Sequence, residues 1–406
     1  MGRPSVPLPT LLRLLYLKHR YGLGYESLCK EVADSISWRR FCRIPLDRPV
    51  PHPTTLSKLV RRAGPGVIAQ LNAALLAKLA GDKLLRARKL RIDTTVVEAD
   101  IDYPTDADLL ERSVRKLGGL VRRIKARGAA NRTPFRDRGR AAGRRMKQLA
   151  RTLRRRTGVA MTEVDRLTGQ VARIAKQTLR QAQAVGHNAH RALARRADDR
   201  WLGRLVGELQ ETIGQTERLL WQTQQRLGGN RVIPDRLVSL SDPDARPIRK
   251  GKPQHPTQFG YTLLLGEDER GFIADHRLEQ GNPPDVGQLV PAVERVVAIT
   301  GRAPGTVVGD RGFGTAANDQ ALAELGVARI GLQRNGTPGK TRRALEQTRA
   351  FRRMRNWRVG IEARISHLKR GFGLRRTRLR RPPGAKTWVG LGVFAYNLQR
   401  MTVIAR

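Results

Sequence analysis

Three acidic residues are the strongest candidates for chemistry in this 406-residue chain. Asp93 lies within the β-branched segment RIDTTVVE, and Asp310 ends the apolar run TVVGD, directly before the glycine-containing segment RGFGT. Carboxylates can serve acid–base or metal-dependent reactions, but an acid at the end of a strand more often caps the following turn. For each of these two residues taken alone, the capping interpretation is therefore the better one.

Glu362 is the third candidate, and its surroundings distinguish it. Residues 331–381 contain 17 Lys and Arg but only two acids, Glu346 and Glu362. Helical spacing places Arg358, Glu362 and Lys369 along one stripe of a helix. The alternative for Glu362 is a plain i, i+4 ion pair with Arg358, which stabilises a helix by only a few tenths of a kcal/mol.

The charge of the whole chain indicates a polyanionic partner. Lys and Arg number 79 against 35 Asp and Glu, giving a formal net charge of +44, so nucleic acid is the leading candidate. Residues 111–230 alone hold 29 Lys and Arg and 9 acids. Solvated helix faces would explain part of this surplus. A surplus this large repels itself unless it is neutralised, which favours contact with phosphates.

Hydrophobic periodicity predicts an α/β fold with a sheet of mixed direction. Alternation over 90–101 predicts a strand that carries Asp93, and helical spacing dominates from 106 to 229. Downstream, the patterns predict a hairpin of strands 259–265 and 272–278, a helix capped by Asp285, a strand at 305–310, a helix at 316–325 and a strand at 327–332.

The first 85 residues read as short helices with a Pro-rich interruption at 45–53. After it, Thr54 or Thr55 can cap a helix that carries three basic residues, Lys58, Arg61 and Arg62. A basic helix after a tight turn is typical of helix-turn-helix DNA recognition, although many such pairs are simply parts of a helical bundle.

Other protein classes are disfavoured by the sequence. The longest apolar stretch, 388–405, is interrupted by Asn397, Gln399 and Arg400, so we expect no transmembrane span. The two cysteines are too few for a disulfide framework or a four-ligand zinc site, and the N-terminus lacks a signal-peptide pattern, so we expect a reducing compartment, the cytoplasm. An RNA-binding structural protein is disfavoured by an aromatic content of 5%.

The acidic cluster at 100–108 could bind a metal, but loop capping is the better interpretation.

Three segments together resemble the Asp-Asp-Glu transposases of bacterial insertion sequences. These are RIDTTVVE around Asp93, VVGDRGFGT around Asp310 and RVGIEARISHLKRGFGLRR around Glu362. The last segment is similar to the Tyr-x2-Arg-x3-Glu-x6-Lys signature at Arg358, Glu362 and Lys369, but Arg355 replaces the tyrosine. The N-terminal stretch GYESLCKEVADSISWRRFCRIPLDRPVPHPTTLSKL resembles the helical entry domain of these proteins, and the segment SLSDPDARPI also fits. The subgroup it resembles is the ISNCY-like one.

This resemblance implies an RNase H-like catalytic core interrupted by a large helical insertion after its first strand. The implied division is an N-terminal helical, helix-turn-helix DNA-binding domain at 1–85, the core at 86–105 and 231–380, a basic helical insertion at 106–230 and a C-terminal helix at 381–406. Asp93, Asp310 and Glu362 would then be the catalytic residues and metal ligands. Arg358, Lys369 and Arg355, with Lys58, Arg61 and Arg62, would bind DNA.

The implied reaction is metal-dependent DNA transposition in the bacterial cytoplasm, at the nucleoid. Two Mg2+ or Mn2+ ions suit three carboxylates, because these hard cations take oxygen ligands and stabilise charge on the attacking and leaving oxygens together. Water would free a 3′ hydroxyl at a transposon end, and that hydroxyl would attack target DNA. Double-stranded DNA, with its terminal inverted repeats, and a homo-oligomer formed on it are the expected partners. A catalytically inactive or domesticated transposase that only binds DNA is the alternative.

Overall fold

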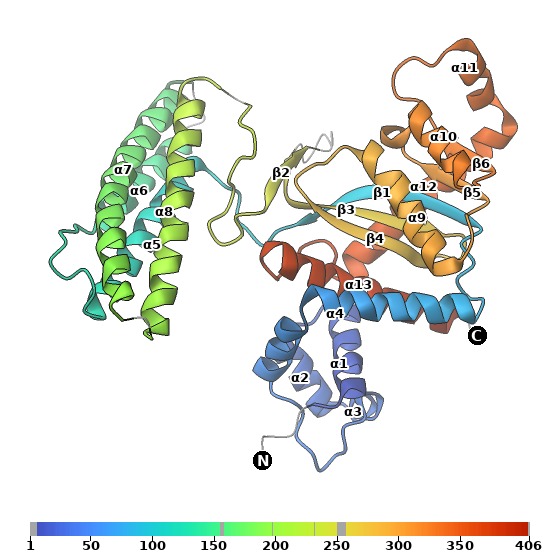
Figure 1. The fold of residues 1–406 in the computed structure, drawn as a ribbon, viewed down its shortest axis with the longest axis horizontal. Coiled ribbons are helices and arrows are strands. Elements are labelled where there is room, and N and C mark those ends of the chain that lie inside the picture. Colours follow the sequence, from blue (N-terminus) through green and yellow to red (C-terminus); the bar gives the residue numbers. More distant parts are fainter. Residues whose placement is uncertain (1–5, 155–157, 197, 231, 250–256, 405–406) are drawn as a thin grey trace. The chain divides into compact units, whose positions relative to one another are not determined.

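The computed structural model describes residues 6–154, 158–196, 198–230, 232–249 and 257–404. The chain divides into two compact units (Figure 1). One consists of Met1–Asp100 together with Ile248–Arg406, and the other of Ile101–Pro247. Among the described residues, none of the helices is both long and apolar enough to cross a bilayer.

A six-stranded sheet of mixed direction forms the centre of the first unit. Its strands are β1 (Lys89–Glu98), β2 (Arg246–Arg249), β3 (Thr257–Asp268), β4 (Ile273–Gln280), β5 (Thr306–Gly309) and β6 (Arg329–Leu332). The order is β2-β3-β1-β5-β6, and β4 also pairs with β3. β3 runs antiparallel to β1 and β4, whereas β5 runs parallel to β1 and β6. The predicted α/β fold with a mixed sheet is confirmed; the short strand β2 was not predicted.

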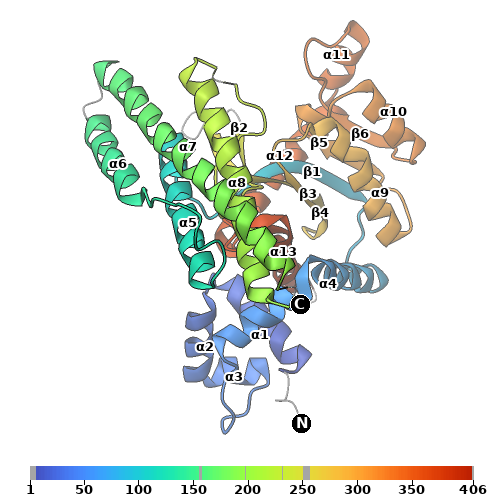
Figure 2. The ribbon, with the colours of Figure 1, turned by 60° about the vertical axis from the view of Figure 1, so that its left-hand side comes forward.

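The two faces of the sheet are covered by different helices, as alternation along β1 requires. Leu90 and Ile92 pack with α9 (Leu289–Thr300) on one face, in a cluster that also holds residues of α4. Val97 points to the opposite face and packs with α12 (Arg349–Gly371) and α13 (Arg381–Ile404). Figure 2 shows α12 and α9 on either side of the strands.

The remaining helices of this part are short and lie on either side of β6 in sequence. They are α10 (Ala316–Glu324), which follows the 3₁₀ turn Arg311–Phe313, and α11 (Lys340–Gln347), which precedes α12. The predicted helix at 316–325 is thus confirmed. Thr315 caps α10 by accepting a hydrogen bond from the Asn318 backbone N–H at 3.1 Å.

Four helices precede the sheet: α1 (Leu8–Arg20), α2 (Tyr25–Asp34), α3 (Ile36–Cys42) and α4 (Pro53–Gly81). α4 is kinked at Gly64, whose φ of 65° and ψ of −176° are not helical, and Pro65 follows. The predicted cap at Thr54 or Thr55 is wrong. His52 caps α4, because its ring nitrogen Nδ1 accepts from the Thr54 N–H, and Pro53 occupies the first turn, where a missing N–H is tolerated.

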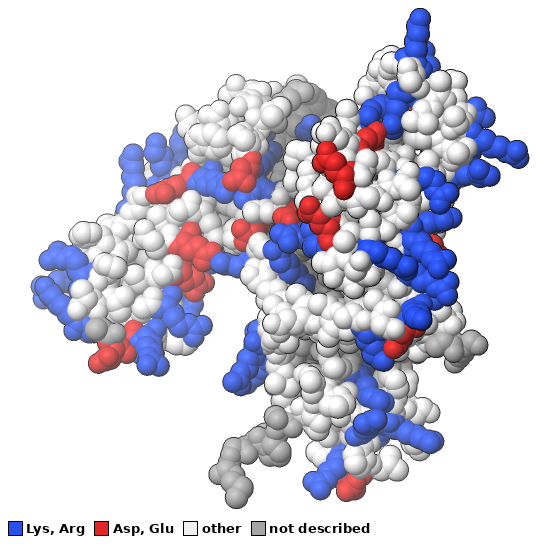
Figure 3. All heavy atoms as spheres, turned by 45° about the vertical axis from the view of Figure 1, so that its right-hand side comes forward, with Lys and Arg blue, Asp and Glu red and all other residues white. Residues whose placement is uncertain are grey.

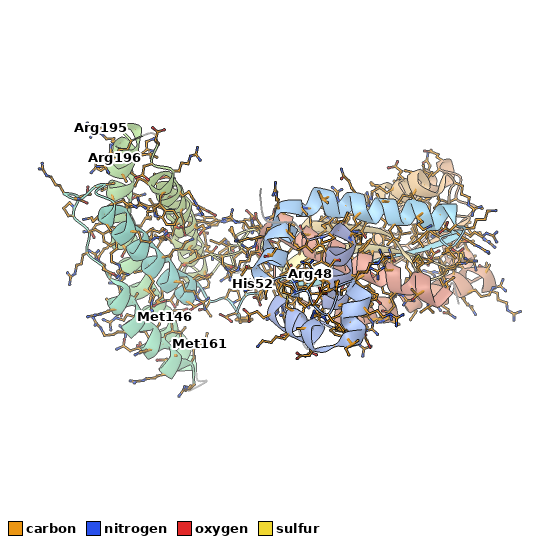
Figure 4. The ribbon with its side chains drawn as sticks, turned by 90° about the horizontal axis from the view of Figure 1, so that it is seen from below. Arg48, His52, Met146, Met161, Arg195 and Arg196 are labelled. Carbon is orange, nitrogen blue, oxygen red and sulfur yellow. The ribbon has the colours of Figure 1, made fainter. Side chains whose placement is uncertain are left out.

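The expected tight turn before the basic helix is also absent from this described region. Residues 43–52 connect α3 to α4 without helix or strand, and Arg48 and His52 lie on this connection (Figure 4). Arg39 of α3 holds the connection in place by donating to the carbonyls of Pro45, Leu46 and Arg48 at 2.6–3.1 Å. Arg39 therefore has a structural role.

The second unit is a bundle of four helices: α5 (Asp106–Ala126), α6 (Gly139–Leu153), α7 (Gly158–Ala194) and α8 (Arg200–Leu227). Apolar side chains spaced three and four residues apart are buried, with Leu167 and Val171 on α7 and Leu202 and Leu209 on α8 all at most 2% exposed. Figure 4 shows Met161 near one end of α7 and Arg195 and Arg196 at the other. The long helical interruption after the first strand is confirmed.

The acidic cluster at the entrance to this bundle is structural. Asp106 is 3% exposed and pairs with Arg226 at 3.1 Å and Arg236 at 2.8 Å. Asp108 pairs with Arg112 at 2.9 Å, while Thr105 caps α5 through the Asp108 N–H. The carboxylates of Asp106 and Asp108 thus form ion pairs, and the cap of α5 is the Thr105 hydroxyl, whereas the capping interpretation expected one of the acids.

Candidate active site

Asp93 lies in the middle of β1, on the face of the sheet that α12 covers. Its side chain is 15% exposed, and its Oδ1 accepts a hydrogen bond from the Thr94 backbone N–H at 2.7 Å. The neighbouring side chains Ile92 and Thr94 point to the other face, as strand geometry requires. The strand therefore presents this one carboxylate towards α12.

Asp310 follows the last residue of β5. β1 and β5 are parallel neighbours in the sheet, and Ile92 is paired with Gly309. The residues that follow this pair, Asp93 and Asp310, therefore lie at the same level of the sheet. The turn after Asp310 is closely packed, since a Cβ on Gly314 would lie 1.8 Å from the Gln333 carbonyl oxygen. Only glycine fits there, and the tight turn leaves the Asp310 side chain 56% exposed.

Glu362 lies on α12, whose start is fixed by Thr348, which accepts from the Phe351 N–H at 3.2 Å. Ile361 and Leu368 are fully buried against the sheet, and the Glu362 side chain beside them is 60% exposed. The helix thus places the Glu362 carboxylate near the two aspartates.

Arg358 joins the three carboxylates into one cluster. Its Nη1 lies 3.3 Å from Asp93 Oδ2 and 3.8 Å from Asp310 Oδ1, while its Nη2 lies 2.9 Å from Glu362 Oε1. The Arg358 side chain is only 16% exposed. The predicted i, i+4 pair is present, but it is one part of a larger arrangement in which a single guanidinium is surrounded by acids from three distant segments.

This arrangement has the donor chemistry of a site for hard divalent cations. Three carboxylates are gathered around one positive group, and oxygen donors are those that Mg2+ and Mn2+ prefer. Within the described residues, no three potential ligands are close enough together to hold an ion as they stand. The guanidinium of Arg358 occupies the space between them.

The position of α12 depends on a buried carboxylate that the sequence analysis missed. Glu267 of β3 is fully buried and accepts from Arg91 Nε at 2.8 Å and from Arg364 Nε at 2.7 Å. Arg364 belongs to α12, and Arg91 also donates to the Trp357 carbonyl of that helix at 2.9 Å. The predicted strand 259–265 ended before Glu267, whereas β3 extends to Asp268 and buries both acids at its end.

Gly360 allows Arg91 to come this close to the helix. A Cβ at this position would lie 2.2 Å from Arg91 Nη1. The same guanidinium also lies over the Trp357 ring, with its carbon 5.1 Å from the ring centroid. Trp357 is therefore a half-buried anchor for Arg91.

Asp285 has a different role from the predicted one. It begins a 3₁₀ turn (Asp285–Gln288) rather than capping α9, whose N-cap is Gln288. Its Oδ1 accepts from Thr94 Oγ1 at 3.1 Å, and its Oδ2 would lie 2.8 Å from a Cβ on Gly312. Asp285 thus connects the strand of Asp93 to the loop that follows Asp310, from the other face of the sheet.

The predicted DNA-binding residues lie in two places. Arg355 is exposed and Lys369 is half-buried on α12, with Lys369 two turns beyond Glu362. Lys58, Arg61 and Arg62 are exposed on the first half of α4. Blue side chains far outnumber red ones on the face that Figure 3 presents.

Comparison with known families agrees with this geometry. Residues 1–62 match the family model described as Transposase domain (DUF772), and residues 235–398 match the one described as Transposase DDE domain. The chain belongs to the DDE transposases of insertion sequences. A search of curated proteins and a search of solved structures gave no match.

The transposase matches cover the three acids unequally. Asp310 and Glu362 lie within the matched range 235–398, whereas Asp93 lies in neither matched range. The grouping of Asp93 with the other two acids therefore depends on the fold itself, through the β1–β5 register and Arg358. The bundle of the second unit is likewise outside the matched ranges, apart from its last residues.

Proposed function

We propose that this transposase cleaves DNA at the ends of its insertion sequence and joins the freed 3′ hydroxyl to target DNA, with Asp93, Asp310 and Glu362 as its catalytic carboxylates. The observation that carries the proposal is their convergence on Arg358, at 2.9–3.8 Å, from three separate elements. Elsewhere in the described residues, an arginine such as Arg342 pairs with two acids, Asp319 and Glu346. Three exposed or partly exposed acids around one guanidinium are better explained as a site.

The proposed catalytic core is RNase H-like. The path β4-β3-β1-β5-β6, with β3 antiparallel to its neighbours and the last three strands parallel, supports this assignment. The first acid lies on the first strand, the second follows β5, and the third lies on a helix packed across the sheet. Asp310 directly follows the carboxyl end of β5, which is where α/β sheets commonly place reacting groups.

Asp93, Asp310 and Glu362 would hold two Mg2+ or Mn2+ ions, as the oxygen donor set supports. When bound, such ions stabilise negative charge on the attacking and leaving oxygens of a phosphodiester. Arg358 contacts all three carboxylates and so offsets part of the repulsion between three like charges. Glu267, through Arg91 and Arg364, fixes the helix that carries Arg358 and Glu362.

Binding of double-stranded DNA is assigned to the basic surfaces. The exposed arginines and lysines of α4 and of the helical bundle would contact phosphates, which position DNA without reading its sequence. We expect Lys369 to place the scissile strand near the carboxylates, and the protein to act as a homo-oligomer on its DNA ends. Retention of all three acids in one cluster disfavours the alternative of a DNA-binding protein without catalysis.

Substitution of each acid tests the proposal. Asp93→Ala, Asp310→Ala and Glu362→Ala should each abolish cleavage of end-bearing DNA in Mg2+ while binding of the same DNA is largely retained, because a metal ligand is removed and not a phosphate contact. Glu346→Ala, in the same basic segment but paired with Arg342 at 3.0 Å, is the matched control. Near-normal turnover by any of the three variants would exclude that residue from the site.

A further inference from the structure

A small cavity of about 190 Å³ lies between the end of α1, the loop after α12 and α13, all within the first unit. Its charged and aromatic lining consists of Lys18, His19, Arg375, Arg376, Arg378 and Trp388. This lining contains four cationic side chains and no acid. The transposase reaction as proposed above makes no use of it.

Lys18 is the unusual member of this group. It is 3% exposed, and its Nζ lies 4.3 Å from the centroid of the Trp388 ring and 4.9 Å from that of Tyr25. In the part of the chain that the structure describes, no carboxylate lies within 4 Å of this ammonium. A buried charge without a counter-ion is strongly unfavourable. Burial and the nearby charge of Arg378 accordingly lower the pKa of Lys18 to about 8.

The three arginines add to this positive charge only in part. Arg376 is paired with Glu98 at 3.5 Å and with Asp100 at 3.8 Å. Arg375 and Arg378 are exposed at the mouth of the cavity, and neither forms an ion pair with another described residue. The cavity therefore combines a buried ammonium with two available guanidinium groups, which is a site for an anion.

The loop that forms the cavity is held rigidly. The Glu98 N–H donates to the Arg375 carbonyl at 3.0 Å, and the Thr377 N–H donates to the Glu98 carbonyl at 2.8 Å, which fixes the loop to the end of β1. Trp388 Nε1 donates to the Gly373 carbonyl at 2.8 Å on the other side. Since β1 carries Asp93 and α12 carries Glu362 directly before this loop, an anion held here has a fixed position relative to both carboxylates.

A second cavity shares one lining residue, Arg378, with the first. This second space, of about 470 Å³, is lined by Arg61 of α4, by Arg378 and Arg380 of the loop, and by the start of α13. Its one acidic lining residue, Asp100, is paired with Arg376 at 3.8 Å. A single small anion would need only the first cavity, whereas a chain of successive phosphates would follow the basic residues from one cavity into the next.

We propose that the cavity around Lys18 binds one phosphate group of the DNA backbone, with Arg375 and Arg378 as further ligands and Arg61 and Arg380 contacting the neighbouring backbone. This assignment rests on the proposed function only in that DNA is the substrate. The contact fixes the register of the DNA on the protein, because a phosphate contact positions the duplex without reading bases.

Lys18→Met tests the assignment, because methionine keeps the apolar stem between Trp388 and Tyr25 and removes the charge. Affinity for a fluorescently labelled duplex should fall about tenfold at low salt. The slope of log affinity against log salt, measured between roughly 50 and 200 mM, should become shallower by about 0.9 for each phosphate that the variant no longer binds. Thermal stability should hold or rise, since an unpaired buried charge is removed. Arg378→Gln, at an exposed position, should weaken binding in the same direction without risk to folding.

Lys30→Met on α2, an exposed lysine outside the cavity, is the matched control and should leave affinity and slope close to wild type. A series of duplexes with one neutral methylphosphonate each locates the contact. At the contacted position the wild-type protein loses affinity, and Lys18→Met loses no more, because the same interaction is already absent.

Three outcomes would overturn the assignment. If wild type binds the duplex and Lys18→Met binds it with equal affinity and salt slope, the cavity does not contact DNA, although the proposed function stands. A second outcome is that inorganic phosphate or pyrophosphate raises the melting temperature of wild type but not of Lys18→Met, while both proteins bind DNA equally well. In that case the site binds a small anion and not DNA. Failure of the wild-type protein to bind any duplex would refute the proposed function and this contact with it.

Discussion

Arg358 Nη1 lies 3.3 Å from Asp93 Oδ2, although 265 residues separate the two in sequence. The contact has both partners about 15% exposed, so it is screened less than a surface ion pair. It also brings the acid that neither family match covers into the cluster of the other two. The positive group that contacts all three acids is therefore part of the chain itself.

Replacement of Arg358 by glutamine should expose the repulsion that it now balances. We expect Arg358→Gln to lower the free energy of unfolding by about 1–2 kcal/mol in EDTA, because three carboxylates lose their shared partner. Added Mg2+ should then raise the melting temperature more than it does for wild type, since no guanidinium competes for the carboxylates. Thermal unfolding with EDTA and with Mg2+ measures both effects. Arg355→Gln, exposed on the same helix, is the control, and an equal Mg2+ response in both variants would contradict the prediction.

Glu267 should contribute strongly to stability because it is the buried partner of two arginines. Glu267→Gln leaves Arg91 and Arg364 without their shared carboxylate, and we expect a loss of about 3–5 kcal/mol in the free energy of unfolding. Chemical denaturation of the two proteins measures it. Glu279→Gln on β4 removes a more exposed pair with Arg277 and should lose less than about 1 kcal/mol. Similar losses from both would mean that the Glu267 network does not fix α12.

The sequence predicted the elements of this site better than their contacts. Alternation around Asp93 and helical spacing around Glu362 are local patterns, and both were confirmed. The proximity of Asp93 and Asp310 depends on the pairing of β1 with β5. These strands are far apart in sequence, and local periodicity does not determine which strands pair. The reach of Arg358 to Asp93 depends on the docking of α12, which Glu267 on β3 fixes from far away in sequence.

For Asp285, a local sequence rule gave a wrong prediction. A local rule assigned it to a helix start, since an acid before an apolar helix is a common cap. In the structure its carboxylate accepts from Thr94 Oγ1, 191 residues away, and a 3₁₀ turn separates it from α9. A side chain with a long-range partner cannot be recognised from the residues on either side of it.

Asp268 should make stability depend on pH. Burial raises the pKa of its carboxyl to about 6, although backbone N–H groups of Phe272 and Arg270 donate to Oδ1 and partly oppose the change. The folded state therefore binds a proton more tightly than the unfolded state, whose pKa is near 3.8. Protonation of Asp268 therefore adds to the free energy of unfolding. This contribution is fully present below about pH 4 and is lost as the pH rises through about 6.

Asp268→Asn should remove this dependence, because the amide stays neutral and keeps an oxygen to accept both N–H groups. We expect the variant to exceed wild type at pH 8 by up to about 3 kcal/mol, from about 1.4 kcal/mol for each pKa unit, and to match it near pH 4. Denaturation curves across this range decide the matter. Asp268→Ala, which lacks the acceptor, should be less stable than Asp268→Asn at every pH; a constant difference between wild type and Asp268→Asn would refute the raised pKa.

Lys369 and Lys147 should separate strand placement from general DNA affinity. Lys369 lies seven residues after Glu362 on α12, whereas Lys147 is exposed on α6 of the helical bundle. If Lys369 positions the scissile strand, Lys369→Ala should slow end cleavage far more than it weakens nonspecific binding, because misplacement of a reacting group by a small distance is costly to rate. Lys147→Ala should do the reverse and flatten the salt dependence of binding by about 0.9 if it contacts one phosphate. Cleavage rates and duplex affinities of both variants, measured at the same salt concentration, give the comparison. Small and equal effects would mean that Lys369 is an ordinary solvated lysine, and that the stripe shared with Glu362 follows from helix geometry alone.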